Sequence, residues 1–192
     1  MEFLHLWSID LAREPASRRR AAANDALRQI LALHLPAGSA EVELVRGEGG
    51  KPRLADGGPE FNLSHSGELA LVALSAEHPV GVDVEEMRPE RDPLALAERA
   101  LGPEDVLAIR AADPDERDRV FYRLWARHEA RLKCLGVGVF REPPPEPAAM
   151  TVRDLEPAPG YAAAVAVEAP SLPPLRRWTF DPRGASKRRQ PG

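Results

Sequence analysis

The stretch Pro79–Glu90, PVGVDVEEMRPE, opens on an alternation in which every second residue from Val80 to Val84 is valine. A period of two residues is that of a β-strand, so the three valines share one face while Gly81, Asp83 and Glu85 share the other. A sheet does not need two carboxylates beside a glycine in order to fold. The acidic face is therefore a candidate for chemistry, and the alternative is a solvated strand end.

Proline and glycine divide the rest of the chain into short elements. We expect a first helix capped by Ser17 and ended by Pro36 and Gly38, and a hairpin of residues 60–66 and 68–76 that turns at Gly67 and joins the acidic strand in one antiparallel sheet. The other expected elements are a strand at 41–46, helices within 92–102 (capped by Asp92 and closed by Gly102) and 113–136, and strands at about 149–155, 161–168 and 175–180.

These elements predict an α+β fold of two similar halves related by a pseudo-two-fold, each a helix packed on an antiparallel sheet. The expected boundaries are residues 1–90 for the N-terminal half and 91–181 for the C-terminal half. The last stretch, 182–192, is expected to be disordered because it is short, polar and terminal.

Composition narrows the function classes. The 192 residues are 43% hydrophobic, which is enough for one ordinary core, and Cys134 is the single cysteine, which excludes an internal disulfide and a cysteine-based zinc site. A net charge of −4 argues weakly against nucleic-acid binding. No apolar run approaches the ~18 residues of a membrane span, and Glu2 and Asp10 stand where a signal peptide would carry basic residues, so we expect a cytoplasmic protein.

The long second-half helix carries Trp125, Glu129 and Lys133 on one stripe, at intervals of four residues. Glu129 before Lys133 is the favourable order for a surface ion pair, which is worth only a few tenths of a kcal/mol. The sharper hypothesis is that Glu129 adds a third carboxylate to Asp83 and Glu85 around Mg²⁺, which prefers such oxygen ligands. The helix alone leaves both open.

A third group of candidates comes from GGKPRL and FNLSHSG. Lys51 follows a glycine-rich turn, and Ser64 and His65 lie on the expected strand after it. Lysine, serine and histidine are ordinary phosphate-binding groups, and equally ordinary loop residues.

Taken in order, GKPRL, FNLSHS, VGVDVE and FYRLWARHEARLKCLG resemble the motif set of the 4'-phosphopantetheinyl transferases, in the single-chain branch named after surfactin-synthetase activation. The resemblance runs from about Gly50 to Gly136. It implies transfer of the 4'-phosphopantetheine arm of coenzyme A to a serine of an apo acyl or peptidyl carrier protein, with release of 3',5'-ADP. The branch serves fatty-acid, polyketide and peptide synthases, and we expect a monomer that binds neither nucleic acid nor membrane.

The resemblance also implies residue roles. Asp83, Glu85 and Glu129 would hold Mg²⁺, with Glu129 as the base for the carrier serine and Lys133 at the pyrophosphate. The residues implied to contact coenzyme A are Lys51, Pro52, Ser64, His65 and Lys133, with Arg19 from the triple arginine at 18–20 for the 3'-phosphate.

The chain departs from the family pattern at His128, where lysine usually precedes the helix glutamate, and at Ala126, where serine or threonine is usual. A histidine is mostly neutral at pH 7. It either makes a pH-dependent contact to coenzyme A or packs inside the fold. Two other functions stay open: a Mg²⁺-dependent hydrolase of nucleotide pyrophosphates, and a non-catalytic binder of coenzyme A or carrier protein.

Overall fold

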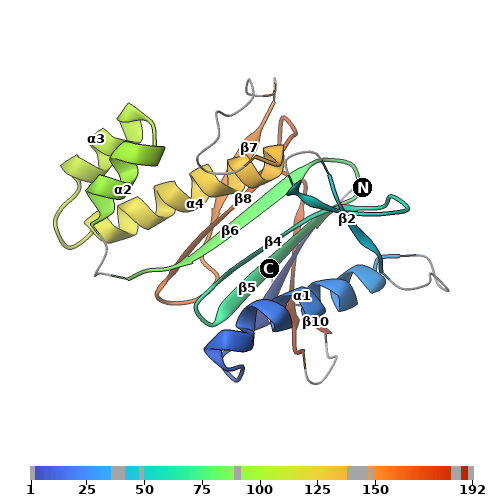
Figure 1. The fold of residues 1–192 in the computed structure, drawn as a ribbon. Helices are drawn as coiled ribbons and strands as arrows, with labels where there is room; N and C mark the ends of the chain where they lie inside the picture. The colour runs from blue at the N-terminus through green and yellow to red at the C-terminus, as the bar shows by residue number, and fades with distance from the viewer. Residues whose placement is uncertain are drawn as a thin grey trace.

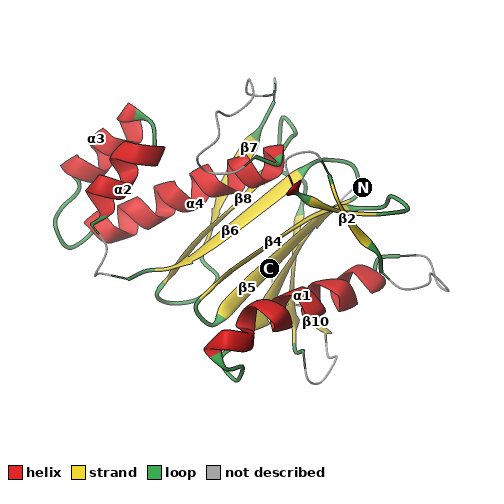
Figure 2. Cartoon of the chain, in the orientation of Figure 1, coloured by secondary structure: helices red, strands yellow, loops and turns green. Residues whose placement is uncertain are grey.

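The computed structural model describes residues 3–35, 42–47, 50–88, 92–137, 147, 149–182 and 187–189. Figures 1 and 2 show how its strands and helices are arranged. In chain order they are β1 (Leu4–Asp10), α1 (Ala16–Ala32), β2 (Leu44–Arg46), β3 (Pro52–Leu54), β4 (Glu60–Ser66), β5 (Leu69–Ser75), β6 (Val80–Glu86), α2 (Pro93–Ala100), α3 (Pro103–Ala111), α4 (Arg117–Leu135), β7 (Thr151–Leu155), β8 (Tyr161–Val167), β9 (Leu175–Phe180) and β10 (Lys187–Arg189).

The strands form two main sheets and one small ribbon. The larger sheet has the order β10-β9-β1-β5-β4, the second has β6-β8-β7, and β2 pairs with β3. All pairs are antiparallel except β1 with β9. The α+β class is confirmed, whereas the pseudo-two-fold stays a prediction.

We expected the acidic strand β6 to join the sheet of the hairpin, and this prediction is wrong. Strand β6 pairs with β8. It also lies beside β4 (Figure 1). Side chains of β4 take the place that backbone carbonyls would have in a shared ladder. Backbone N–H groups of every second residue of β6 donate to β4 side chains: Val82 to Asn62 Oδ1 at 2.9 Å, Val84 to Ser64 Oγ at 3.3 Å and Glu86 to Ser66 Oγ at 3.0 Å. This polar seam joins the two sheets.

Each sheet is covered by one long helix (Figures 1 and 2). Leu27, Ile30 and Leu31 of α1 are fully or nearly fully buried in one core with Trp7 and Phe180. Helix α4 crosses the β6-β8-β7 sheet, and α2 and α3 pack against α4. Among the described residues, no helix is both long and apolar enough to span a lipid bilayer.

Several expected boundaries are wrong in detail. Ser17 does not cap α1, because Pro15, with φ −53°, already precedes its first turn, and the helix ends at Ala32. Pro36, Gly38 and Glu41 lie outside the described residues. Gly102 caps the start of α3, a helix that the sequence did not predict.

Other expectations hold. The Asp92 carboxylate accepts from the backbone N–H groups of Leu94 and Ala95, so it caps α2. Gly136 ends α4 in the left-handed conformation, at φ 72°. The β4–β5 hairpin turns at Gly67, whose φ is 55°.

The end of the chain differs from the predicted plan. Strand β9 pairs in parallel with β1, so C-terminal chain completes the sheet of the N-terminal half. Residues 187–189, within the segment expected to be disordered, pair with β9 as β10. The remainder of that segment, apart from Pro182, lies outside the described residues.

Candidate active site

The site forms where β6 and α4 pack most closely. A Cβ added to Gly81 would lie 2.1 Å from Ala130 O and 2.3 Å from Cys134 N, so only glycine lets the helix backbone approach the strand this closely. Asp83 follows on the same strand face and Glu129 precedes Ala130 on the helix. The glycine thus sets how near the two acids can come.

Asp83, Ser64 and Lys133 form one hydrogen-bonded group. Lys133 Nζ donates to Asp83 Oδ1 at 2.6 Å and to Ser64 Oγ at 3.0 Å, and Ser64 Oγ donates to the same carboxylate oxygen at 2.9 Å. Asp83 is only 2% exposed. Its second oxygen, Oδ2, is buried and accepts no hydrogen bond from the described residues. Side chains of β4 and α4 therefore hold one oxygen of this β6 carboxylate, and its other oxygen remains available to a ligand.

Glu129 is 9% exposed, and the charges of both strand acids, Asp83 and Glu85, act on it. Burial, reinforced by the negative charges of Asp83 and Glu85 and opposed by Lys133, raises the pKa of Glu129 to about 7. Glu129 is therefore a buried acid and does not form the predicted surface ion pair with Lys133. A carboxyl group that titrates near neutrality is suited to accept a proton in a reaction at that pH.

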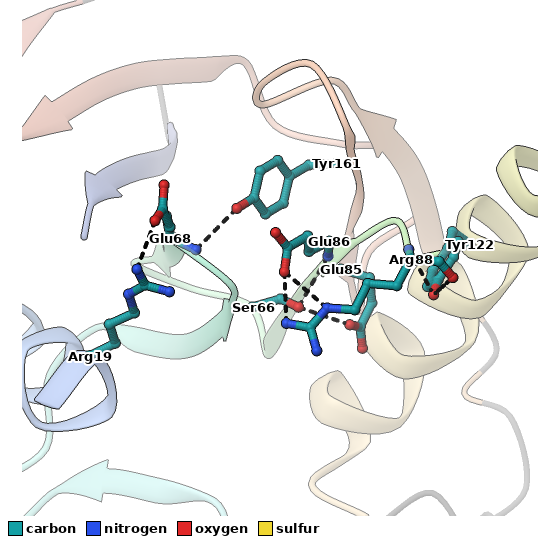
Figure 3. Close-up of polar contacts among 8 residues, drawn as sticks. All are labelled: Arg19, Ser66, Glu68, Glu85, Glu86, Arg88, Tyr122 and Tyr161. Carbon is teal, nitrogen blue, oxygen red and sulfur yellow. Dashed lines mark hydrogen bonds and ion pairs between the residues drawn. The ribbon is translucent and has the colours of Figure 1, made fainter. Parts of the chain in front are cut away.

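Glu85 extends the acidic face toward solvent. Ser66 Oγ donates to Glu85 Oε2 at 3.1 Å while it accepts from Glu86 N, so the serine holds this carboxylate against the seam (Figure 3). In the described part of the chain, no three His, Cys, Asp or Glu residues form a ready-made metal cluster. The charges of Asp83 and Glu85 act on Glu129, but the three predicted acids are not arranged as a metal centre.

A pocket of about 320 Å³ adjoins these acids, between α1 and β4. Its lining includes four predicted residues, Pro52, Ser64, His65 and Lys133, together with Arg20. Burial and then the charges of Arg20 and Lys133 lower the pKa of His65. The positive charges of Arg20 and Lys133 in one hollow favour an anion between them.

Arg19, the predicted 3'-phosphate partner, does not line this pocket. Its Nη2 donates to Glu68 Oε1 at 2.7 Å, and its Nε donates to Glu14 O, so it fastens α1 to the β4–β5 turn (Figure 3). Its neighbour Arg20 lines the pocket instead. The sequence could not choose among three consecutive arginines, because the choice depends on which helix face packs on β4.

Lys51 and His128 also lie elsewhere. Lys51 Nζ donates to two backbone carbonyls. Among the described residues, Lys51 does not line the pocket. His128 is half-buried, and burial together with Arg131 lowers its pKa despite Asp105. It is therefore neutral at pH 7, which favours packing over a charged contact to coenzyme A.

A second hollow, of about 640 Å³, lies between Arg119 and Arg123 of α4 and the β7–β8 turn. It contains none of the predicted site residues. Size alone therefore does not locate the chemistry.

Known proteins identify the family. A model of the 4'-phosphopantetheinyl transferase superfamily matches residues 79–161, which include β6 and α4. HetI of Nostoc sp., a 4'-phosphopantetheinyl transferase, is 35% identical over 185 aligned positions, which cover 84% of this chain and 78% of HetI. The chain belongs to the 4'-phosphopantetheinyl transferase superfamily.

Other transferases of the superfamily match shorter stretches. AcpT of Salmonella typhimurium is 39% identical over 95 residues, covering 49% of this chain and 50% of AcpT. A protein of Synechocystis sp. is 38% identical over 117 residues, covering 59% of this chain and 48% of its own length. The alignments with these two relatives thus span about half of each relative. The superfamily match contains Asp83, Glu85, Glu129 and Lys133, so it falls on the buried acids described above.

Proposed function

We propose that the chain transfers the 4'-phosphopantetheine arm of coenzyme A to a serine of an apo acyl or peptidyl carrier protein and releases 3',5'-ADP. One observation carries the proposal: a pocket lined by Arg20, His65 and Lys133 opens beside two buried carboxylates, Asp83 and Glu129. Positive charges that can bind a phosphate thus lie near acids that can hold a metal ion and accept a proton. Membership in the superfamily supports the same reading.

The acids fit a magnesium ion in their chemistry. Asp83 Oδ2 is buried without a hydrogen-bond partner among the described residues, and burial together with nearby negative charge raises the pKa of Glu129. Asp83, Glu85 and Glu129 would hold the ion, since Mg²⁺ prefers carboxylate oxygens and keeps waters and phosphate oxygens as its other ligands. When bound, it would neutralise the charge that builds on the pyrophosphate.

The chain's own residues account for the remaining steps. The carrier serine oxygen forms a bond to the β-phosphorus, the bond from that phosphorus to the bridging oxygen breaks, and 3',5'-ADP leaves with the electron pair. Glu129 accepts the serine proton, and Lys133 and His65 bind phosphate oxygens. Pro52 and Arg20, which line the same pocket, are the proposed contacts to the nucleotide end.

Mass spectrometry of apo carrier proteins tests the proposal. With coenzyme A and Mg²⁺, an apo acyl, polyketide or peptidyl carrier should gain the mass of phosphopantetheine while 3',5'-ADP appears. Free phosphopantetheine with an unmodified carrier would indicate a pyrophosphate hydrolase, and no product would indicate a non-catalytic binder. Either of these outcomes refutes the proposal. The carrier class that gains mass fastest identifies the client.

Variants connect the activity to this site. Asp83→Ala and Glu129→Gln should each abolish the mass gain, and Asp25→Asn, an exposed acid on α1, should leave it unchanged. Full transfer by Asp83→Ala would refute the metal assignment. Chelation by EDTA, reversed by added Mg²⁺, checks the ion separately.

A further inference from the structure

The Lys51 side chain is turned into the protein. Its Nζ donates to Val80 O at 2.9 Å and to Cys134 O at 3.3 Å, and it lies 3.7 Å from Glu60 Oε2. An ammonium group has three donors; the two carbonyls accept two of them, and the Glu60 carboxylate lies at ion-pair distance. The side chain is only 15% exposed.

One of these acceptors belongs to the last turn of α4, whose final carbonyls lack partners within the helix. Val137 N donates to Leu132 O at 2.9 Å and Gly136 N donates to Lys133 O at 3.3 Å. The next carbonyl, that of Cys134, accepts from Lys51. Lys51 therefore continues the C-terminal cap of α4, at the helix end that favours a cation.

The other acceptor is at the first residue of β6. Val80 is three residues before Asp83, and Cys134 directly follows Lys133. Gly81, the point of closest approach between strand and helix, lies between these anchors and the site. Lys51 thus bonds to both elements that carry the acids, at the end of their interface nearest to the Lys133–Asp83 contact.

We infer that Lys51 is a positioning residue that fixes α4 against β6, and that it does not bind the nucleotide of coenzyme A. This inference rests on the proposed transfer. The cations that line the pocket among the described residues are Arg20 and Lys133, and Pro52 brings the GKP turn to its wall without the lysine side chain.

The separation of kcat from KM tests the inference. Lys51→Met keeps the length of the side chain and removes its donors. We expect kcat to fall at least ten-fold, KM for coenzyme A to change less than three-fold, and the melting temperature to fall. Arg20→Met, a change in the pocket wall, should show the opposite pattern, with a raised KM and a nearly unchanged kcat.

Chemical rescue separates positioning from a general loss of stability. Lys51→Cys treated with 2-bromoethylamine regains an ammonium at nearly the original distance, and buried Cys134 should not react. We expect the treatment to restore kcat, whereas the treated wild-type chain should be unchanged. If Lys51→Met does not fold, Lys51→Arg takes its place, with a lowered kcat and an unchanged KM expected.

Two kinetic results would overturn the inference: a ten-fold higher KM for coenzyme A at unchanged kcat, or unchanged kcat and KM. If the wild-type chain transfers nothing, the proposed function fails, and amide hydrogen exchange then decides about Lys51. Faster exchange in the last turn of α4 and the start of β6 of Lys51→Met supports the tie, and unchanged exchange refutes it.

Discussion

Glu129 and Lys133 show at the residue scale how one spacing can hide two environments. An interval of four on a helix predicts a solvent-exposed ion pair. In the fold, Lys133 instead reaches Asp83 on another element and Glu129 is buried. The sequence identifies the shared stripe, whereas the partner of each group depends on what packs over that stripe.

Glu129 should make stability fall with rising pH in the metal-free protein. Its pKa is about 7 in the fold against an ordinary value of 4.5, so between these pH values the native state binds more protons than the unfolded state. Stability from this group is fully present below pH 4.5, is lost as pH rises to 7 and is constant above. The loss amounts to about 3 kcal/mol.

Glu129→Gln removes this titration. In EDTA, its free energy of unfolding should exceed that of the wild type by up to about 3 kcal/mol at pH 8, with the difference vanishing toward pH 4.5. Urea unfolding across this range measures both curves. Parallel curves would show that Glu129 has no raised pKa.

Cys134 should be inert in the native chain. It is 3% exposed, its Sγ donates to Pro79 O, and burial raises its pKa to about 11, so only about one thiol in a thousand is ionised at pH 8. A chromogenic disulfide reagent should therefore label no thiol in folded protein and one per chain in denaturant. Rapid labelling of folded protein would contradict its role as a core residue.

At the element scale, the sequence predicted the two faces of β6 correctly but not the strands that lie beside it. Alternation predicted its two faces correctly, since a period of two depends only on the backbone. Its pairing with β8 and its side-chain seam with β4 connect residues that are far apart in sequence. Helix α3 was missed because Gly102 followed by Pro103 resembles a stop signal as much as a new start.

The β6–α4 contact predicts a severe effect of Gly81→Ala. The new Cβ would meet backbone atoms of Ala130 and Cys134, which cannot move aside as a side chain can. We expect a loss of at least about 3 kcal/mol in unfolding free energy, at the upper end of the cost of overpacking. Thermal and urea unfolding measure it.

Gly102→Ala is the matched control. A Cβ at this position meets no atom within 4 Å, so the change should cost less than about 1 kcal/mol through the weaker helix cap. Equal effects of the two substitutions would show that the close approach at Gly81 does not limit stability.

At the scale of the whole molecule, the sheet of the N-terminal half includes a strand from the C-terminal half of the sequence. Strand β9 lies beside β1 in the larger sheet, and its Phe180 is buried in the same core as Trp7. The predicted boundary near residue 90 therefore divides the chain between motifs but does not give two units with complete sheets.

Truncation tests this shared sheet. A chain ending after Pro174 loses β9 and should fail to fold, because β1 becomes an edge and the core loses Phe180. A chain ending after Asp181 keeps β9, loses only the edge strand β10, and should melt within a few degrees of the full chain. Differential scanning calorimetry compares them. A stable, cooperatively folded 1–174 chain would contradict the role of β9.

The sequence by itself determined the local features: the strand faces, the N-cap of α2, the C-terminal end of α4, the hairpin turn, and the acidic and basic residue types that resemble a phosphopantetheinyl transferase. These follow from backbone period and residue chemistry, which act over a few positions. Only the tertiary structure decided that Arg20 lines the pocket, that Lys51 bonds to β6 and α4, and that Glu129 is buried with a raised pKa. Packing between distant segments fixes desolvation and partners, and no single segment contains that information.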